Sequence, residues 1–194
     1  MLAILQVGVT WPIRIIDLTL LYMASFNEIW FNKVNEPYGW LGNMSPHPVM
    51  YEGQEWRTVE ALFQALRFND PKVRKDIREQ DSPMTAKMKA KRNDYQSMRV
   101  VEPMSDQDLA NMRLCLRLKF DAHLELRRRL LATGTALIRE DATGRVGPRD
   151  GFWGARRTER GIEGDNMLGR LLMELREALR ENPPVLEEPP AARS

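Results

Sequence analysis

The chain has 194 residues, of which 43% are hydrophobic and 29% are charged, as expected for one globular domain that buries a core. Its formal net charge of +2 is too small to indicate nucleic-acid binding by itself. The one cysteine, Cys115, excludes an internal disulfide, and together with two histidines it does not make a structural zinc site. Cys115 stands in an apolar helical run, so we expect a core residue rather than a nucleophile.

The ends of the chain differ in composition from its middle. Residues 1–22 contain no run near the roughly 20 apolar residues that span a membrane, and their positive charge follows the apolar run, contrary to a secretory signal. We therefore expect a cytoplasmic protein whose natural start is Met23, with residues 1–22 as an extension or a loose arm. Residues 182–194 are rich in proline and glutamate and predict a disordered tail. The expected domain spans residues 23–181.

In chain order, residues 27–31 predict a short strand, and residues 35–48 predict a loop rich in glycine and proline. Residues 49–56 predict a tight hairpin with a two-residue turn. Thr58 is a suitable N-cap for a helix that ends near Phe68. The buried face of that helix is predicted from its apolar residues at i, i+3, i+4 and i+7, which are Val59, Leu62, Phe63 and Leu66.

Capping patterns mark the starts of further helices. Asp70 and Ser82 each precede a proline and predict helices that end near residues 80 and 93. Ser105 and Asp108 resemble a capping box, which predicts a helix that ends near residue 120. Residues 124–131 predict another helix of similar character.

The last third of the chain mixes strand, loop and helix. Residues 135–140 predict a short strand, and residues 141–151 predict a glycine-rich loop. Asp165 or Asn166 caps a final amphipathic helix that runs to about residue 180. The whole series predicts a mainly helical α+β domain with a small antiparallel β element.

A basic stretch lies between Lys72 and Arg99, where nine lysines and arginines stand against four acidic residues. A patch of this sign favours phosphorylated partners. Solvated helix faces in a protein rich in lysine and arginine would produce the same pattern, so both interpretations stay open.

Polar residues that packing alone does not require occur in three places. The loop at residues 38–43 combines two glycines with a tryptophan and an asparagine, a pattern that suits ligand contact as well as ordinary turns. A predicted helix face carries Glu60, Gln64 and Arg67 at i, i+4 and i+7, which is also common on solvated helices. Residues 150–154 place two aromatic rings between glycines after an aspartate, and a hydrophobic plug would look the same.

Together these places would supply two carboxylates, several aromatic rings and, near Asn166, the free backbone N–H groups of a helix start. In the cleavage of a glycosidic bond, a carboxylate stabilises the oxocarbenium-like transition state, and a second carboxyl group activates water or protonates the departing base. An indole stacks on a nucleobase. Spacing alone does not select this chemistry over others.

Several segments, in this order and spacing, resemble the YbiA/NADAR family from about Ile29 to Leu179. They are residues 38–46 (YGWLGNMSP), 56–68 (WRTVEALFQALRF), 82–84 (SPM), 116–120 (LRLKF), 130–134 (LLATG), 150–154 (DGFWG) and 164–173 (GDNMLGRLLM). The resemblance implies a mainly α-helical domain with N-glycosidase activity, no metal and no cofactor. It also implies the substrate, either a ribosylated pyrimidine intermediate of riboflavin biosynthesis or ADP-ribose on a modified guanine in DNA. The expected partners are therefore a ribosylated nucleobase, an ADP-ribosyl small molecule or ADP-ribosylated DNA, with no membrane.

The resemblance assigns roles by position. Glu60 matches the main catalytic carboxylate, and Asp150 matches a second catalytic or ribose-binding acid. Trp153 would stack on the base or shape the pocket, and Asn43 and Asn166 would bind ribose and phosphate. The other residues expected to bind substrate are Trp56, Gln64, Arg67 and Gly154.

Some positions depart from the family pattern. Ala61 and Leu62 stand where the family often has His-Tyr. Arg67 replaces the usual lysine, and Ala90-Lys91 replaces a common Gly-Arg pair. These departures motivate an alternative, a non-catalytic module that binds ADP-ribose or NAD-related nucleotides. A further alternative is a nucleic-acid-binding protein that uses the basic stretch described above.

Overall fold

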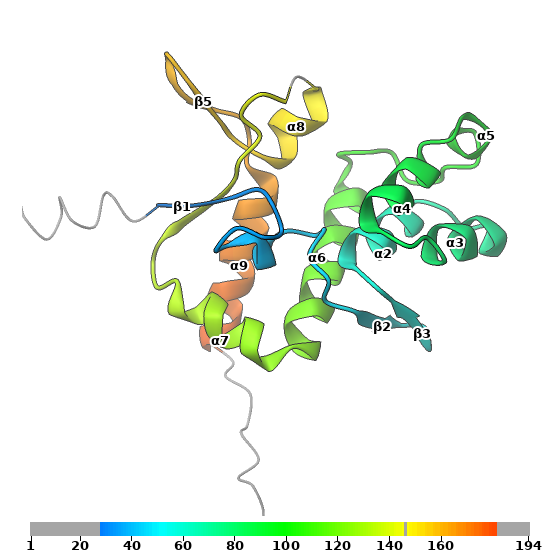
Figure 1. The fold of residues 1–194 in the computed structure, drawn as a ribbon, viewed down its shortest axis with the longest axis horizontal. Coiled ribbons are helices and arrows are strands. Elements are labelled where there is room, and N and C mark those ends of the chain that lie inside the picture. Colours follow the sequence, from blue (N-terminus) through cyan, green and yellow to red (C-terminus); the bar gives the residue numbers. More distant parts are fainter. Residues whose placement is uncertain (1–27, 146, 182–194) are drawn as a thin grey trace, which may run out of the picture.

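The computed structural model describes residues 28–145 and 147–181, so the expectations for residues 1–22 and 182–194 lie outside the described part of the chain. Within it the chain forms a mainly helical α+β domain, which confirms the predicted fold class. Figure 1 shows two long helices near the middle of the molecule, α6 (Asp106–Ala122) and α9 (Met167–Glu181), which pack against each other. None of the described helices is both long and apolar enough to cross a membrane.

Two short strands from distant parts of the chain form a parallel pair. Strand β1 (Glu28–Phe31) lies beside β4 (Leu137–Glu140), with Ile29 opposite Ile138, and α9 packs against β4. Both strands were predicted as elements, but not as partners. Because the strands are parallel, their carboxyl ends reach the same edge of the pair, and the residues that follow them meet there.

Two hairpins make up the antiparallel part of the fold. Strands β2 (Val49–Tyr51) and β3 (Gln54–Trp56) form the predicted hairpin, and Glu52 and Gly53 at its turn both have positive φ, of 50° and 70°. Positive φ at both turn positions suits the twist of a tight hairpin. A second hairpin, β5 (Arg156–Thr158) and β6 (Gly161–Glu163), was not predicted, because its short polar strands lack alternating apolar residues.

Helix α2 (Val59–Ala65) begins where Thr58 Oγ1 accepts a hydrogen bond from the Ala61 N–H, as predicted. It ends before the predicted Phe68, because the chain leaves the helix and Phe68 forms an isolated bridge with Arg99. All of α2 is buried, since α3 (Pro71–Arg78), α4 (Pro83–Ala90) and α6 surround it.

The predicted caps of the next helices are present. Asp70 accepts hydrogen bonds from the first turn of α3, and Ser82 does so for α4. A further short helix, α5 (Asn93–Gln96), and a 3-10 turn, η1 (Gly39–Leu41), were predicted only as loop. Ser105 caps α6, but Asp108 does not return to the Ser105 N–H, because its carboxylate binds elsewhere in the core.

Helix α6 carries Cys115, which is fully buried in the core as expected. Burial raises the pKa of its thiol, so the reactive thiolate is disfavoured. Helix α7 (Leu124–Ala132) follows as predicted, and α9 begins directly after Asn166. The predicted loop at residues 141–151 is wrong in its second half, because α8 (Pro148–Trp153) begins there with a proline at its first position.

Candidate active site

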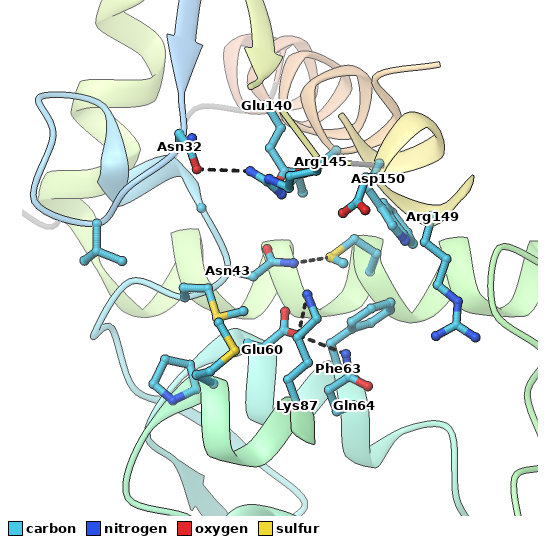
Figure 2. Close-up of a pocket in the computed structure, with 18 of the residues that line it drawn as sticks. Asn32, Asn43, Glu60, Phe63, Gln64, Lys87, Glu140, Arg145, Arg149 and Asp150 are labelled. Carbon is cyan, nitrogen blue, oxygen red and sulfur yellow. Dashed lines mark hydrogen bonds and ion pairs between the residues drawn. The ribbon is translucent and has the colours of Figure 1, made fainter. Parts of the chain in front are cut away.

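A cavity of about 780 Å³ opens between two walls of the molecule (Figure 2). One wall comes from α2, α4 and the loop around η1, and the other comes from the carboxyl ends of β1 and β4 and from α8. Cavities of this size hold small-molecule ligands. The structure brings six of the nine predicted site residues onto its lining, namely Asn43, Glu60, Gln64, Arg67, Asp150 and Trp153.

Glu60 lies in the first turn of α2 and is only 4% exposed. Its backbone N–H donates to the Asn43 carbonyl oxygen at 3.1 Å, so the loop after η1 holds the start of the helix. Its Oε1 accepts a hydrogen bond from Gln64 Nε2 at 2.9 Å and lies 3.9 Å from the Lys87 ammonium. The carboxylate is thus held in place while it still borders the cavity.

Gln64 lies one turn after Glu60 on α2, and Arg67 stands just after the end of that helix. Each is also 4% exposed, which excludes a solvated helix face. Arg67 donates from Nε and Nη2 to both carboxylate oxygens of the buried Asp108, each at 2.8 Å. Its Nη1 donates to Gln64 Oε1 at 3.0 Å, and its guanidinium carbon lies 4.4 Å from the centroid of the Phe63 ring. Most of the N–H donors of Arg67 therefore bind acceptors of the protein itself. The hydrogen bond to Gln64 fixes the Gln64 amide, which in turn donates to Glu60.

Asn43 borders the cavity with one polar atom unused. Its Nδ2 contacts the sulfur of Met112 at 3.3 Å. Its Oδ1 is buried and has no hydrogen-bond partner among residues 28–145 and 147–181. A buried acceptor without a partner is unfavourable unless a ligand satisfies it. Its position on the lining makes Asn43 a candidate contact for a molecule in the cavity.

Helix α8 places Asp150 and Trp153 on the opposite wall, and Figure 2 shows the Asp150 carboxylate there. Asp150 Oδ2 accepts a hydrogen bond from the Gly147 N–H at 3.1 Å, which caps the start of the helix. The Trp153 ring packs edge-to-face on Phe63 of α2, with 5.5 Å between ring centroids, and on Phe152 at 5.1 Å. The Trp153–Phe63 contact joins the two walls at one end of the cavity.

A third carboxylate, Glu140, borders the cavity at the carboxyl end of β4 and was not predicted. Burial raises the pKa of Glu140, against the opposing effect of Arg145, whose Nη1 donates to its Oε1 at 3.1 Å. Arg145 Nη2 also donates to Asn32 Oδ1 at 3.0 Å, just after β1. The position of Glu140 depends on the pairing of β1 with β4, which local sequence patterns do not report.

Three cationic side chains, Lys87, Lys91 and Arg149, lie on the cavity lining. Burial, followed by the charges of Lys87 and Arg149, lowers the pKa of Lys91, whereas Glu60 and Asp150 act in the opposite direction. Neither Lys91 nor Arg149 forms an ion pair with a carboxylate in the part of the chain that the structure describes. The sequence predicted no role in the site for these three residues: Lys87 and Lys91 belong to the basic stretch, and Lys91 is also one of the departures from the family pattern.

The remaining predicted site residues, Trp56, Gly154 and Asn166, do not line the cavity. Trp56 is 3% exposed and borders a separate, smaller cleft beside the β2–β3 hairpin. Asn166 donates from Nδ2 to the Ile138 carbonyl at 2.8 Å, and its Oδ1 accepts from the Glu140 N–H at 3.1 Å. Gly154 is in such close contact with β4 that an added Cβ would lie 2.8 Å from the Glu140 carbonyl oxygen. Asn166 and Gly154 therefore hold the strand that carries Glu140.

Known proteins share sequence and fold with this chain. The profile of the family described as NADAR domain matches residues 30–180. The chain is 37% identical to N-glycosidase YbiA of Escherichia coli over 150 residues, which cover 77% of this chain and 86% of that protein. It is 34% identical to an N-glycosidase of Nostoc punctiforme over 158 residues, which cover 78% of this chain and 92% of that protein.

A riboflavin biosynthesis protein of Vibrio vulnificus is 30% identical over 162 residues, which cover 80% of this chain and 40% of that protein. Among solved structures, the NMR structure of the E. coli protein YbiA matches with a TM-score of 0.65 and 33% identity, covering 87% of this chain and 96% of that one. The names of the relatives support the predicted enzyme class, a glycosyl hydrolase. The chain belongs to the NADAR domain family.

Proposed function

We propose that this protein is an N-glycosidase that hydrolyses the N-glycosidic bond of a ribosylated base. The observation that carries the proposal is the buried carboxylate of Glu60 on one wall of a cavity whose other wall presents Asp150 and Trp153. The substrate is a phosphoribosylamino-pyrimidine of riboflavin biosynthesis or ADP-ribose on a modified guanine in DNA. The name of the Vibrio vulnificus relative supports the first of these.

In the proposed reaction the bond between ribose C1′ and the base nitrogen breaks, and its electron pair leaves with the nitrogen. Water adds a hydroxyl group to C1′, and its proton goes to the departing base. Positive charge grows on the sugar as the bond breaks, and the Glu60 carboxylate stabilises it. Asp150, on the opposite wall, binds the ribose or takes the proton from water.

Substrate binding follows from the free groups of the lining. The unpartnered Oδ1 of Asn43 accepts a hydrogen bond from a ribose hydroxyl. Trp153 offers an indole to the base, since aromatic rings stack on nucleobases of any sequence. Gln64 and Arg67 keep Glu60 in its orientation through the hydrogen bonds that join them. Asn166 and Gly154 act from outside the cavity, through their contacts with the strand of Glu140.

The cluster of Lys87, Lys91 and Arg149 favours a substrate that carries phosphate. An arginine binds phosphate through two parallel N–H donors, whereas lysine acts as a point charge. Both candidate substrates contain phosphate attached to the ribose. The excess of positive charge at this part of the lining therefore supports the phosphorylated substrates over simple nucleosides.

The test is incubation of the purified protein with a phosphoribosylamino-pyrimidine and, separately, with ADP-ribosylated DNA, followed by mass spectrometry. We expect release of ribose 5-phosphate in the first case or of ADP-ribose in the second. Removal of the phosphate from the cleaved substrate should raise KM more than it changes kcat. Failure to form products from either substrate, at protein concentrations that show binding, overturns the N-glycosidase proposal.

That outcome would favour the alternative of a binding module for ADP-ribose or NAD-related nucleotides. Its motivation was the set of departures at positions 61, 62, 90 and 91. Ala61, Leu62 and Ala90 are buried and do not line the cavity, whereas Lys91 does. The structure gives this alternative no further support.

The nucleic-acid alternative relied on the basic stretch between Lys72 and Arg99. Several of its charges are neutralised in ion pairs, such as Lys89 with Asp76 at 2.9 Å and Arg92 with Asp94 at 2.7 Å. Charges that already have carboxylate partners contribute less to phosphate binding. We therefore expect this surface to bind unmodified DNA weakly and in a salt-dependent manner.

A further inference from the structure

Lys119 is a buried lysine in the segment at residues 116–120, to which the sequence analysis assigned no role in the site. It lies on α6 and is 0% exposed. Its ammonium donates to the carbonyl oxygens of Trp40 and Gly42, at 2.6 and 3.0 Å, and to Ser45 Oγ at 2.8 Å. The described residues place no carboxylate in an ion pair with it, so only neutral acceptors compensate the loss of water around the charge.

The three acceptors belong to one loop segment, residues 40–45, which comprises the end of the 3-10 turn η1 and the residues after it and which borders the cavity. Gly42 and Asn43 of this loop lie on the lining. The Asn43 carbonyl oxygen accepts the hydrogen bond from the Glu60 N–H at 3.1 Å, which anchors the first turn of α2. A short chain of contacts therefore runs from the ammonium through the loop to Glu60.

We propose that Lys119 is a positioning residue for the N-glycosidase reaction, which holds residues 40–45 in place and so sets the positions of Asn43 and Glu60. This inference rests on the proposed function. Lys119 has its three N–H donors in use on the loop, so it has none left for a substrate, and it acts only through its neighbours. A buried charge on neutral acceptors is an unfavourable choice for stability alone, because an apolar side chain of similar volume avoids the desolvation penalty.

The protonation state of Lys119 changes near neutral pH. Burial lowers its pKa to about 7. His47 is the titratable group next to the segment at residues 40–45, since its Nδ1 lies 3.0 Å from Ser45 Oγ, and Lys119 acts on the pKa of His47. His123 and Arg129 lie further out, where His123 packs on the His47 ring and Arg129 lies over the Trp40 ring. A neutral amine has two N–H donors instead of three, so one acceptor of the loop loses its partner. We expect turnover to fall as the pH rises above about 7, as Lys119 loses its proton.

The test compares Lys119→Met with a matched control, Arg176→Met, by steady-state kinetics on the substrate that wild type cleaves. Arg176 is also a buried cation, 3% exposed on α9. It donates to Thr133 Oγ1 at 2.8 Å and to the Ala136 carbonyl at 2.9 Å, on a turn that does not line the cavity. A displacement of about 1 Å at Glu60 lowers turnover about 100-fold, so we expect a loss of that order in kcat for Lys119→Met and a smaller change in KM. Arg176→Met should keep kcat close to wild type.

Two further variants keep the inference open to disproof if Lys119→Met does not fold. Ser45→Ala removes one acceptor of the ammonium and should lower kcat in the same direction, by less. Lys119→Arg keeps the charge well above neutral pH and should remove the fall in turnover above about pH 7. A kcat that stays at the wild-type value in Lys119→Met, or in Ser45→Ala when Lys119→Met is unfolded, overturns the inference.

Failure of the proposed function has a different signature, because wild type itself then forms no product from either substrate. In that case the positioning role of Lys119 is tested by calorimetry, which compares the affinities of wild type and Lys119→Met for ADP-ribose. Weaker binding by the lysine variant than by Arg176→Met supports the positioning role, and equal binding refutes it.

Discussion

Glu60 has a hydrogen bond from Gln64 of its own helix and an ammonium, Lys87, at 3.9 Å. Glu60→Gln preserves the shape of the side chain but removes the negative charge that stabilises the sugar cation. We expect kcat to fall by about 10²–10⁴-fold while the far-ultraviolet circular dichroism spectrum stays unchanged. Glu55→Gln, at an exposed position on β3, is the control. Undiminished activity in Glu60→Gln would remove this carboxylate from the mechanism.

Trp153 borders the cavity and is held by edge-to-face packing on Phe63 and Phe152. Trp153→Ala removes the ring that we expect to stack on the base. The loss of binding free energy should be about 1–3 kcal/mol, the range for base–aromatic stacking. Calorimetry with a non-cleaved substrate analogue measures it, and Trp30→Ala is a control outside the cavity. Equal affinity of wild type and Trp153→Ala would contradict stacking.

At the scale of elements, the Arg67–Asp108 ion pair joins the segment directly after α2 to α6, with both side chains almost fully buried. Arg67→Met leaves a buried carboxylate without its partner, which lowers the free energy of unfolding by about 3–5 kcal/mol. Urea denaturation measures the change. Arg67→Lys should restore only part of the stability, since an ammonium does not reproduce the two parallel N–H donors.

A matched control for that prediction is the exposed pair of Arg113 and Glu174, which joins α6 to α9 at 3.3 Å. Because solvent screens exposed pairs, Arg113→Met should lower the free energy of unfolding by only about 0.2–1 kcal/mol. Equal effects of Arg67→Met and Arg113→Met would show that burial of the first pair does not matter for stability.

The elements that the sequence predicted well are those with local signals. Thr58, Asp70, Ser82 and Ser105 cap helices where expected, since an N-cap contacts N–H groups only two or three residues away. The prediction missed α8 and the β5–β6 hairpin, because short elements without apolar periodicity resemble loops in sequence.

For the whole molecule, His47 makes stability depend on pH. Burial, and next the charge of Lys119, lowers the pKa of His47 from 6.5 to about 4. Between these values the unfolded chain binds a proton that the folded protein does not, so the free energy of unfolding falls as the pH drops from 6.5 towards 4. The pKa of Lys119 is lowered from 10.5 to about 7, so its contribution to the free energy of unfolding falls as the pH drops between these two values.

The expected measurement is denaturation of wild type and His47→Gln at several values of pH across the acidic window. Carboxylates that lose their charge contribute to both curves, so the difference between the two proteins isolates His47. We expect the stability of wild type relative to His47→Gln to fall on acidification. A difference that stays constant with pH would show that His47 titrates equally in the folded and unfolded states.

The sequence by itself determined the starts of α2, α3, α4 and α6, the apolar face of α2, the mainly helical class and, through several spaced segments, the family. It also showed the spacing of Glu60, Gln64 and Arg67, because these signals extend over a few residues and depend on local geometry. The sequence left open whether that face is solvated or buried.

Tertiary structure decided the cavity itself. Asp108, the partner of Arg67, lies 41 residues away in the sequence. Lys119 is separated by 79 residues from Trp40, whose carbonyl oxygen accepts a hydrogen bond from it. Glu140 reaches the lining only because β1 and β4 pair in parallel, and Trp56 does not reach it because the hairpin turns it into the core. Contacts between distant residues depend on how whole elements pack, and short-range patterns carry no information about that packing.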